Sequence, residues 1–400
     1  MRTLIGLALI LLVALPQTAT AGPYEEGLAL VDNPSRLATR LDEAIGKFKA
    51  AIKQDQNNSH ARYNLGLLYM MKGNLKAAEA AWKATLDADK AYVPARARLA
   101  ELKLRRGDKE GAVALLDGII QEHRYQPEAR NMLAGLAIEA EDWDGAIKHA
   151  RNVLLGDPQN VNAYVNLCVT YFKQGLIDQA WLVATTALDR RREMELPEPA
   201  ALYNLLGLIY LEKDDSRNAA ASFLRALKED PRQLDAKLNL AALELSYGDF
   251  DTALKRFDEA LKVRPKDPML HTSRGVALRG LERYEDAQKG YAKALAIAPD
   301  ALEPYYNLCV LHHQYTNNYE AAATHCAQYK ERIDRNHPKW REITKRLRSI
   351  EDTLEALRAD SMDSEEPLEG ETGGEAPPET EPEKAPPSGN DKAPDTQKAP

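Results

Sequence analysis

Apolar residues along most of the chain recur at helical spacing, and their sizes repeat at fixed positions. Counted from Ala200, small residues at positions 8, 20 and 27 are combined with large residues at positions 11 and 24: Gly207, Ala219, Ala226, Tyr210 and Phe223. Small side chains allow two helices to approach closely, and large side chains fill the space between them. Pro231, at position 32, would end the second helix. The stretch therefore predicts two antiparallel helices packed face to face.

The same pattern of sizes starts eight times between Ser59 and Arg335, and six of the seven steps between starts are 34 residues long. The eight starts are Ser59, Val93, Pro127, Val161, Ala200, Leu234, Pro268 and Leu302. This sequence resembles the tetratricopeptide repeat (TPR), a helix–turn–helix unit of about 34 residues. The resemblance implies an all-α fold, a right-handed superhelical α-solenoid of about eight repeats. It says little about the ligand.

The array begins with a degenerate N-terminal repeat, residues 22–58. Three of its residues fit positions 20, 24 and 27 counted from Glu25: Ala44, Phe48 and Ala51. Its first helix should be distorted around Asn33-Pro34, since terminal repeats of solenoids are commonly atypical.

The repeat length changes once, between the four repeats of residues 59–194 and the four repeats of residues 200–337. Five extra residues, 195–199, follow the basic stretch that starts at Arg190. We interpret them as a proline-bounded loop after an extended second helix. The loop is either a tolerated surface insertion or a functional bend between two half-arrays.

Residues 1–21 read as a secretory signal peptide. Arg2 precedes the apolar run Leu4–Leu15, and Ala19-Thr20-Ala21 is typical of a cleavage site before Gly22. The run is short for a membrane span, although an uncleaved anchor is the alternative. The rest of the chain lacks a long apolar segment. We therefore expect an exported protein of the periplasm or cell envelope, without a membrane span after residue 21.

Residues 338–360 predict one more helix, with an apolar stripe at spacings of three and four: Trp340, Ile343, Leu347, Ile350, Leu354 and Leu357. This helix either caps the last repeat or pairs with a second chain in a short coiled coil.

Residues 361–400 hold eight prolines, eleven acidic residues and three lysines, without an aromatic residue, so we expect a disordered acidic tail. The tail's net charge, 3 − 11 = −8, equals that of the whole chain. The array is therefore nearly neutral, which argues against nucleic-acid binding.

Three cysteines need an explanation in an exported chain. Cys168 occupies a small buried position and is expected in the core. Cys309 and Cys326 belong to one helical hairpin and could form a disulfide in an oxidising compartment. A zinc site formed by Cys309, His312, His325 and Cys326 is a further alternative, although the histidines also fit the large-residue positions 11 and 24.

Catalytic motifs are not recognisable, and neither enzymatic activity nor a cofactor is predicted.

The TPR resemblance implies that the first helix of each repeat lines a concave groove. Groove position 6 is asparagine in four repeats: Asn64, Asn166, Asn239 and Asn307. Groove position 5 adds Tyr63, Asn131, Asn204 and Tyr306. This is similar to the asparagine ladders with which some TPR superhelices hold a peptide backbone, because an amide side chain offers both a donor and an acceptor. The alternative is that Asn-Leu-Gly is a common repeat sequence without a binding role.

The sequence therefore predicts a non-catalytic scaffold or assembly factor of the bacterial cell envelope, which binds protein or peptide segments in its groove. Pilus, gliding-motility and outer-membrane assembly are processes that exported TPR proteins serve. The second hypothesis is a regulatory or substrate-positioning subunit of an envelope enzyme complex that acts on peptidoglycan or exported polysaccharide. A structural oligomer built through the last helix is the third, and the oligomeric state is left open.

Overall fold

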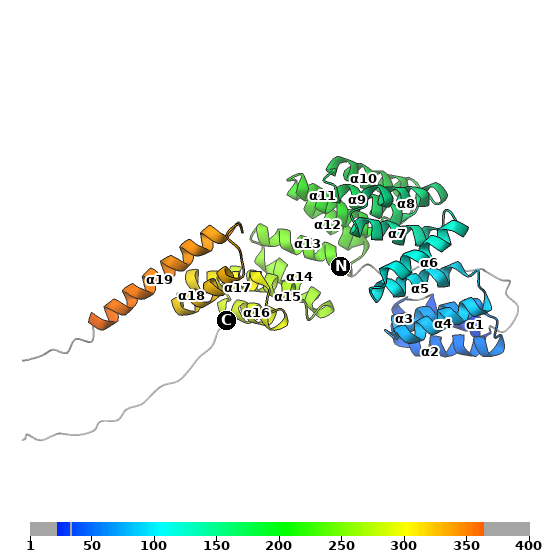
Figure 1. Cartoon of the computed structure of the whole chain (residues 1–400), viewed down its shortest axis with the longest axis horizontal. Coiled ribbons are helices and arrows are strands. Elements are labelled where there is room, and N and C mark those ends of the chain that lie inside the picture. Colours follow the sequence, from blue (N-terminus) through cyan, green and yellow to red (C-terminus); the bar gives the residue numbers. More distant parts are fainter. Residues whose placement is uncertain (1–21, 33, 364–400) are drawn as a thin grey trace, which may run out of the picture. The chain divides into compact units, whose positions relative to one another are not determined.

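The computed structural model describes residues 22–32 and 34–363, and all regular secondary structure in these ranges is helical (Figure 1). The predicted signal peptide and acidic tail lie outside the described residues, except that the last helix continues to Asp363. The first ten helices are α1 (Pro23–Val31), α2 (Pro34–Gln54), α3 (Ser59–Met71), α4 (Leu75–Ala88), α5 (Val93–Arg105), α6 (Lys109–Glu122), α7 (Pro127–Glu139), α8 (Trp143–Gly156), α9 (Val161–Lys173) and α10 (Ile177–Glu193). They are followed by α11 (Ala200–Glu212), α12 (Ser216–Glu229), α13 (Leu234–Ser246), α14 (Phe250–Val263), α15 (Pro268–Gly280), α16 (Tyr284–Ile297), α17 (Leu302–Gln314), α18 (Tyr319–Glu331) and α19 (Trp340–Asp363). The all-α repeat fold is confirmed.

Each of the eight predicted starts is the first residue of a helix, and side-chain capping fixes the beginning of four of them. Asn58, Gln126, Asn160 and Asp267 each accept a hydrogen bond from a backbone N–H in the first turn of α3, α7, α9 and α15, respectively. The turn inside each hairpin is equally regular, because position 15 takes a positive φ in seven repeats: Gly73, Gly107, Glu141, Gly175, Asp214, Gly248 and Glu282. Local sequence therefore sets the helix boundaries.

The hairpin cores pair a small residue on the first helix with a large residue on the second. Trp82, Phe223 and Tyr291 are fully buried against glycines. A Cβ atom added at Gly66, Gly207 or Gly275 would lie 2.2, 2.3 and 2.5 Å from the facing ring, respectively. Only glycine permits this approach, so the pattern of sizes seen in the sequence is a packing requirement.

The N-terminal repeat uses the same contact with a different spacing. Gly27 in α1 faces the ring of Phe48 in α2, 21 residues later, whereas Gly66 and Trp82 are separated by 16. The extra residues form the break after α1 and the first turns of α2, which has non-helical dihedral angles at Arg40. The distortion agrees with the sequence prediction, but numbering from Glu25 does not identify Gly27 as the small residue.

The insertion lengthens α10 to 17 residues, where the other second helices from α4 to α16 have 14. The loop that follows is held by Glu198, which accepts hydrogen bonds from Tyr203 and, at 3.0 Å each, from Arg192 and Arg225. Burial opposes the charge on Glu198, but these hydrogen bonds outweigh it and lower the pKa of the carboxyl. The extended helix and proline-bounded loop are thus observed, and the loop is firmly anchored.

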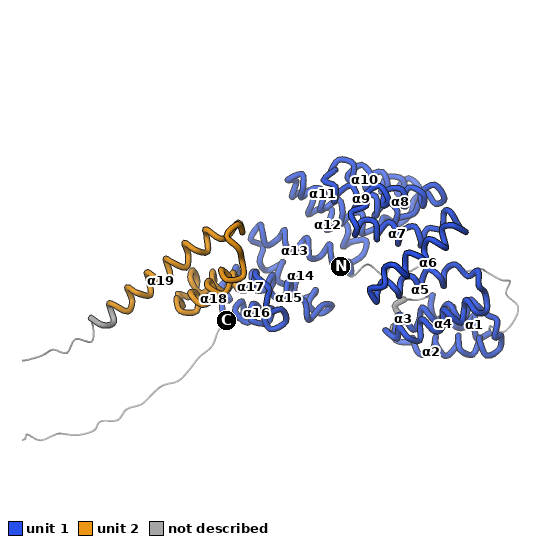
Figure 2. Tube along the Cα trace, in the orientation of Figure 1, with its two compact units in different colours: residues 1–304 blue, residues 305–400 orange. Residues whose placement is uncertain are grey.

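The chain divides into two compact units, residues 1–304 and 305–400, which are described separately (Figure 2). In the second unit a disulfide joins Cys309 in α17 to Cys326 in α18, and α19 packs against α18. Ile343 and Ile350 of α19 are fully buried, whereas Leu357 is 52% exposed. The capping helix is therefore present, and its last turns extend past the hairpin. Within the described ranges, no helix is long and apolar enough to cross a bilayer.

Candidate protein-binding face

Consecutive first helices of the first unit lie against one another. The contacts join α5 to α7, α7 to α9, α9 to α11, α11 to α13 and α13 to α15. Side chains at groove positions 5 and 6 therefore meet across the boundary between neighbouring repeats. This face is the candidate site.

Asparagine side chains bridge these helices in pairs. The Nδ2 atom of Asn166 in α9 donates to the backbone oxygen of Asn131 in α7 at 3.2 Å, and lies 3.3 Å from its Oδ1 atom. The Nδ2 atom of Asn239 in α13 donates to Oδ1 of Asn204 in α11 at 2.9 Å. Asn131 in turn donates to Asn160, the N-cap of α9, at 3.0 Å. Each position-6 asparagine in these repeats thus holds the position-5 asparagine of the preceding repeat.

The bridges leave part of each amide available. Oδ1 of Asn166, Oδ1 of Asn239 and Nδ2 of Asn204 have no hydrogen-bond partner among the described residues. None of them belongs to the fully buried groups that lack a partner, so each keeps some contact with solvent, although Asn204 as a whole is only 9% exposed. The face therefore presents acceptors and a donor whose orientation is already fixed by the bridges.

Partly buried apolar side chains follow the asparagines by three to seven residues on the same helices. They come from three successive first helices: Val169, Phe172, Leu208, Leu211 and Leu245. Ala242, one turn after Asn239 in α13, is exposed. We refer to the surface formed by these residues and the two asparagine pairs as the amide face. It combines apolar contact area with oriented amides, as a surface for an extended peptide requires.

At the N-terminal end of the array the predicted groove residues contact one another. Asn64 is only 8% exposed and lies beside the hydroxyl of Tyr24 in α1. Tyr63 packs against Tyr92 at 5.3 Å between ring centroids, and Arg98 lies beside its hydroxyl. Burial raises the pKa of Tyr63. The side chains of Asn64 and Tyr63 are thus engaged by neighbouring residues. The amide groups that lack a partner among the described residues belong to the asparagine pairs of helices α7 to α13.

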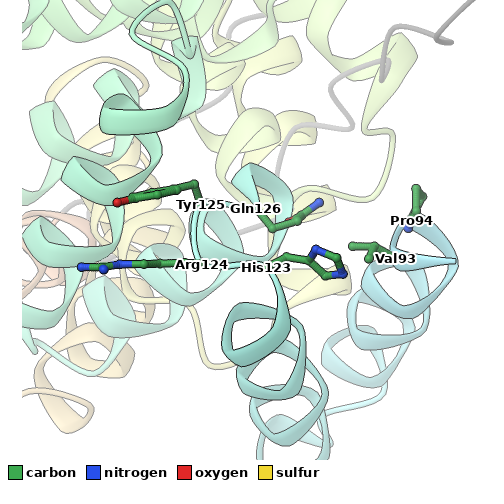
Figure 3. Close-up of a pocket in the computed structure, with 6 residues that line it drawn as sticks. All are labelled: Val93, Pro94, His123, Arg124, Tyr125 and Gln126. Carbon is green, nitrogen blue, oxygen red and sulfur yellow. The ribbon is translucent and has the colours of Figure 1, made fainter. Parts of the chain in front are cut away.

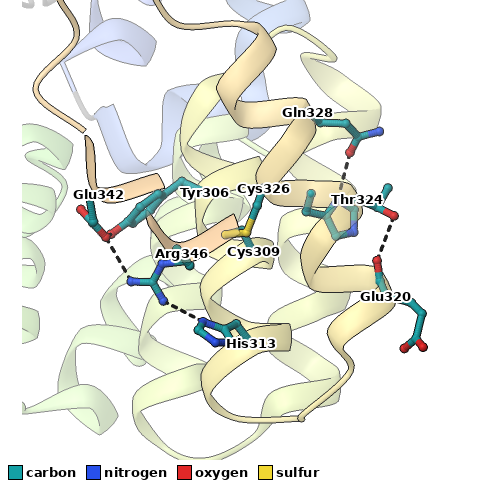
Figure 4. The surroundings of a disulfide bond; sticks show 10 residues. Tyr306, Cys309, His313, Glu320, Thr324, Cys326, Gln328, Glu342 and Arg346 are labelled. Atoms are coloured by element: carbon teal, nitrogen blue, oxygen red, sulfur yellow. Dashed lines mark hydrogen bonds and ion pairs between the residues drawn. A yellow bond between two sulfur atoms is a disulfide. The ribbon is translucent and has the colours of Figure 1, made fainter. Parts of the chain in front are cut away.

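Tyr306 and Asn307 belong to the second unit. The Tyr306 hydroxyl donates to Glu342 of α19 at 2.8 Å (Figure 4). The Lys339 ammonium lies 3.4 Å from the centre of the Tyr306 ring. Burial and the carboxylate of Glu342 raise the pKa of Tyr306. Tyr306 therefore contacts the capping helix, a role that the sequence reasoning missed.

Comparison with known proteins identifies the repeat. Family models described as tetratricopeptide repeat match residues 97–161, 137–205 and 210–275, and one described as TPR repeat matches residues 40–73. The chain belongs to the tetratricopeptide repeat family. TPR arrays form protein-interaction scaffolds, and this chain has that architecture.

The relatives are distant and longer than their match to this TPR protein. The peroxisomal targeting signal receptor of Candida albicans is 27% identical over 160 residues, 38% of this chain and 26% of that protein. The BBSome complex member BBS4 of Bos taurus is 26% identical over 149 residues, 37% of this chain and 28% of that protein. The match thus spans about a quarter of each relative. A chain in the crystal structure of the APC/C hetero-tetramer Cut9–Hcn1 has a TM-score of 0.55 and 13% identity, covering 81% of this chain and 75% of that one, which shows the fold alone.

The cysteines and histidines of the last TPR hairpin lie together, but the sulfur atoms are bonded to each other. The Cα atoms of Cys309 and Cys326 are 4.9 Å apart, and both side chains are fully buried. A disulfide offers no thiolate to a metal, and groups of three or more metal-binding side chains are absent from the described ranges. The rings of His312 and His325 stack at 5.7 Å, so they fill the large-residue positions of the hairpin.

The remaining candidate features are separate from the amide face. Cys168 is fully buried, and burial raises the pKa of its thiol to about 12, as expected for a core residue. A shallow hollow of about 490 Å³ lies between the start of α5 and the α6–α7 turn (Figure 3). It is lined by Val93, Pro94, His123, Arg124, Tyr125 and Gln126. The sequence does not single out these residues as a site, because they share no motif.

Proposed function

We propose that this protein is a non-catalytic scaffold that binds an extended segment of a partner protein along the amide face. The observation that carries the proposal is the pair of asparagine bridges, Asn131–Asn166 and Asn204–Asn239, whose remaining amide groups reach solvent beside apolar side chains. A peptide backbone alternates donors and acceptors, so it can pair with these groups whatever its sequence. Relatives named as receptors for a targeting signal agree with recognition of a segment.

The proposed location is the bacterial cell envelope, where the scaffold would serve the assembly of an exported machine. Two features support export: the signal-like residues 1–21 and the disulfide between Cys309 and Cys326. Disulfides persist in oxidising compartments and are rare in the cytosol.

A matched pair of photo-cross-linking variants tests the proposal in cells. A photoreactive residue replaces Ala242, on the amide face, or Ala221, which is also exposed but lies on the second helix α12. Both sites start from an exposed helical alanine, so they differ mainly in the face that they sample. We expect a discrete cross-linked partner from position 242 and little from position 221. Equal labelling from both positions would place the partner elsewhere.

Asparagine variants then test the amides themselves. Asn166→Ala and Asn239→Ala each remove an outward-facing carbonyl, and one net hydrogen bond contributes roughly 0.5–1.5 kcal/mol. The double variant should bind the cross-linked partner about 1–3 kcal/mol more weakly, which is roughly 5- to 150-fold. Asn152→Ala is the control, because the Asn152 amide donates only to Lys148 of its own helix α8. Unchanged affinity in the double variant, with an unchanged helical signal, would refute a role for the amides.

A further inference from the structure

The exposed side of α19 carries a row of basic residues that have no partner in the described part of the chain. Arg341, Lys345 and Arg348 follow one another at i, i+4 and i+7, so they share one face of the helix. All three are exposed, and none forms an ion pair or hydrogen bond with another described residue. The buried Ile343 and Ile350 lie on the side that packs against α18. We call these three basic residues the α19 stripe.

Three other cations near the stripe are already engaged. Arg346 pairs with Glu342 at 3.1 Å, and Lys339 and Arg332 lie over the rings of Tyr306 and Tyr305. Residues 330–348 contain eight basic and three acidic side chains, a net charge of 8 − 3 = +5 in a chain whose total is −8. Among the described residues, the stripe and Arg335 are therefore the exposed cations of this basic region that lack a partner.

The chain that follows α19 has the complementary charge. Residues 364–383 contain eight glutamates and neither lysine nor arginine. On α19 itself, the exposed Glu351, Asp352 and Glu355 separate this segment from the stripe. Opposite charges thus occur on the same chain, one set on a helix face and the other in the segment directly after it.

We propose that residues 364–383 bind the α19 stripe of the same chain and cover it against other polyanions. Arg348 is 15 residues from Asp363, which is about 22 Å along a helix. An unstructured chain of 20 residues, as the composition predicts here, has a typical end-to-end distance of about 25 Å. The acidic segment can therefore reach the stripe, and tethering gives it a local concentration on the order of millimolar. Three exposed ion pairs would strengthen the contact by a combined factor of roughly 3- to 150-fold.

Zero-length cross-linking tests this contact on the full mature chain. A carbodiimide joins a glutamate carboxyl to the Lys345 ammonium as an amide with loss of water, and peptide mass spectrometry locates the bond. Lys255 of α14 is the control, since it is exposed and unpaired too. We expect bonds from residues 365–383 to Lys345 to exceed those to Lys255 several-fold. They should decrease in 1 M salt, where the Debye length is only about 3 Å.

Variants and isotopes separate the possible outcomes. Arg341→Gln with Arg348→Gln keeps Lys345 reactive but weakens the attraction, so the bond to residues 365–383 should decrease. Equal cross-linking yields at Lys345 and Lys255 would overturn the proposal. So would a yield at Lys345 that does not change in the variant with Arg341→Gln and Arg348→Gln.

A mixture of ¹⁵N-labelled and unlabelled protein identifies bonds between copies. Predominantly mixed-isotope products would likewise overturn contact within one chain and indicate a second copy as the occupant.

Discussion

Gly207→Ala tests the size rule on which every hairpin depends. The added Cβ atom would lie 2.3 Å from Cε1, 2.5 Å from Cδ1 and 2.7 Å from Cζ of Phe223. Carbon atoms prefer separations of about 3.5–4.0 Å, so the ring or the helix must move by more than about 1 Å. Phe223 is fully buried, so its ring is enclosed by neighbouring atoms.

The expected cost follows from two opposing terms. Overpacking costs about 2–3 kcal/mol, the upper part of the usual range, because three ring atoms are affected. Alanine is a better helix former than glycine by about 1 kcal/mol. Gly207→Ala should therefore destabilise its hairpin by about 1–2 kcal/mol. Gly135→Ala in α7 is the control, since its Cβ would meet nothing within 4 Å. It should stabilise by about 0.5–1 kcal/mol.

Native-state hydrogen exchange measures both effects repeat by repeat. Protection should fall first in α11 and α12, because repeats couple mainly to their neighbours. Phe223→Leu, added to Gly207→Ala, recreates the pair formed by Ala100 and Leu116 in the second repeat and should restore part of the loss. If Gly207→Ala stabilised the protein as Gly135→Ala does, or if Phe223→Leu only added its own cost, the packing argument would be wrong.

Three further predictions concern export, the disulfide and the histidines. If residues 1–21 are removed on export, N-terminal sequencing of envelope protein should begin at Gly22, and intact Met1 protein in the cytoplasm would contradict this. Replacing Cys309 and Cys326 by serine should lower the unfolding free energy of the last hairpin by about 3 kcal/mol, measured by denaturant unfolding, because the disulfide closes a 17-residue separation. Burial lowers the pKa of His312 and of its neighbour His325, so the unfolded chain binds more protons just below pH 6.5 and stability should fall as the pH drops through that value. Melting curves at pH 7.5 and 5.5 check this, and His312→Gln should reduce the difference.

Helix positions could be predicted because the information for them is local. An N-cap residue and a small–large pair 16 residues apart lie within one repeat, so a single repeat defines its own boundaries. The N-terminal repeat was harder to interpret, because its glycine and aromatic residue are 21 residues apart. The hydrogen bond between Tyr306 and Glu342 could not be predicted from the repeat pattern, because it depends on how α19 packs against the last hairpin.

The candidate site could be predicted only in part. The sequence indicates that Asn166 and Asn239 lie on the first helices, but not that they hold Asn131 and Asn204. Each of these pairs is 35 residues apart, so the contact exists only once two repeats are stacked. The hypothesis that the asparagines belong to the repeat sequence and the hypothesis that they bind a peptide are thus compatible, because one side of each amide forms the bridge and the other side has no partner among the described residues.

The position of the disulfide also affects which cysteines pair while the chain folds. Cys309 can pair with Cys326, at a separation of 17 residues, or with Cys168, at 309 − 168 = 141 residues. Loop-closure entropy grows as about (3/2)RT ln n, so in the unfolded chain the nearer partner is favoured by about 2 kcal/mol, or roughly 20-fold. Once the repeats fold, Cys168 is fully buried and no longer competes. A chain with three cysteines can therefore reach one native pairing without an isomerase, because its two partners lie in the same hairpin.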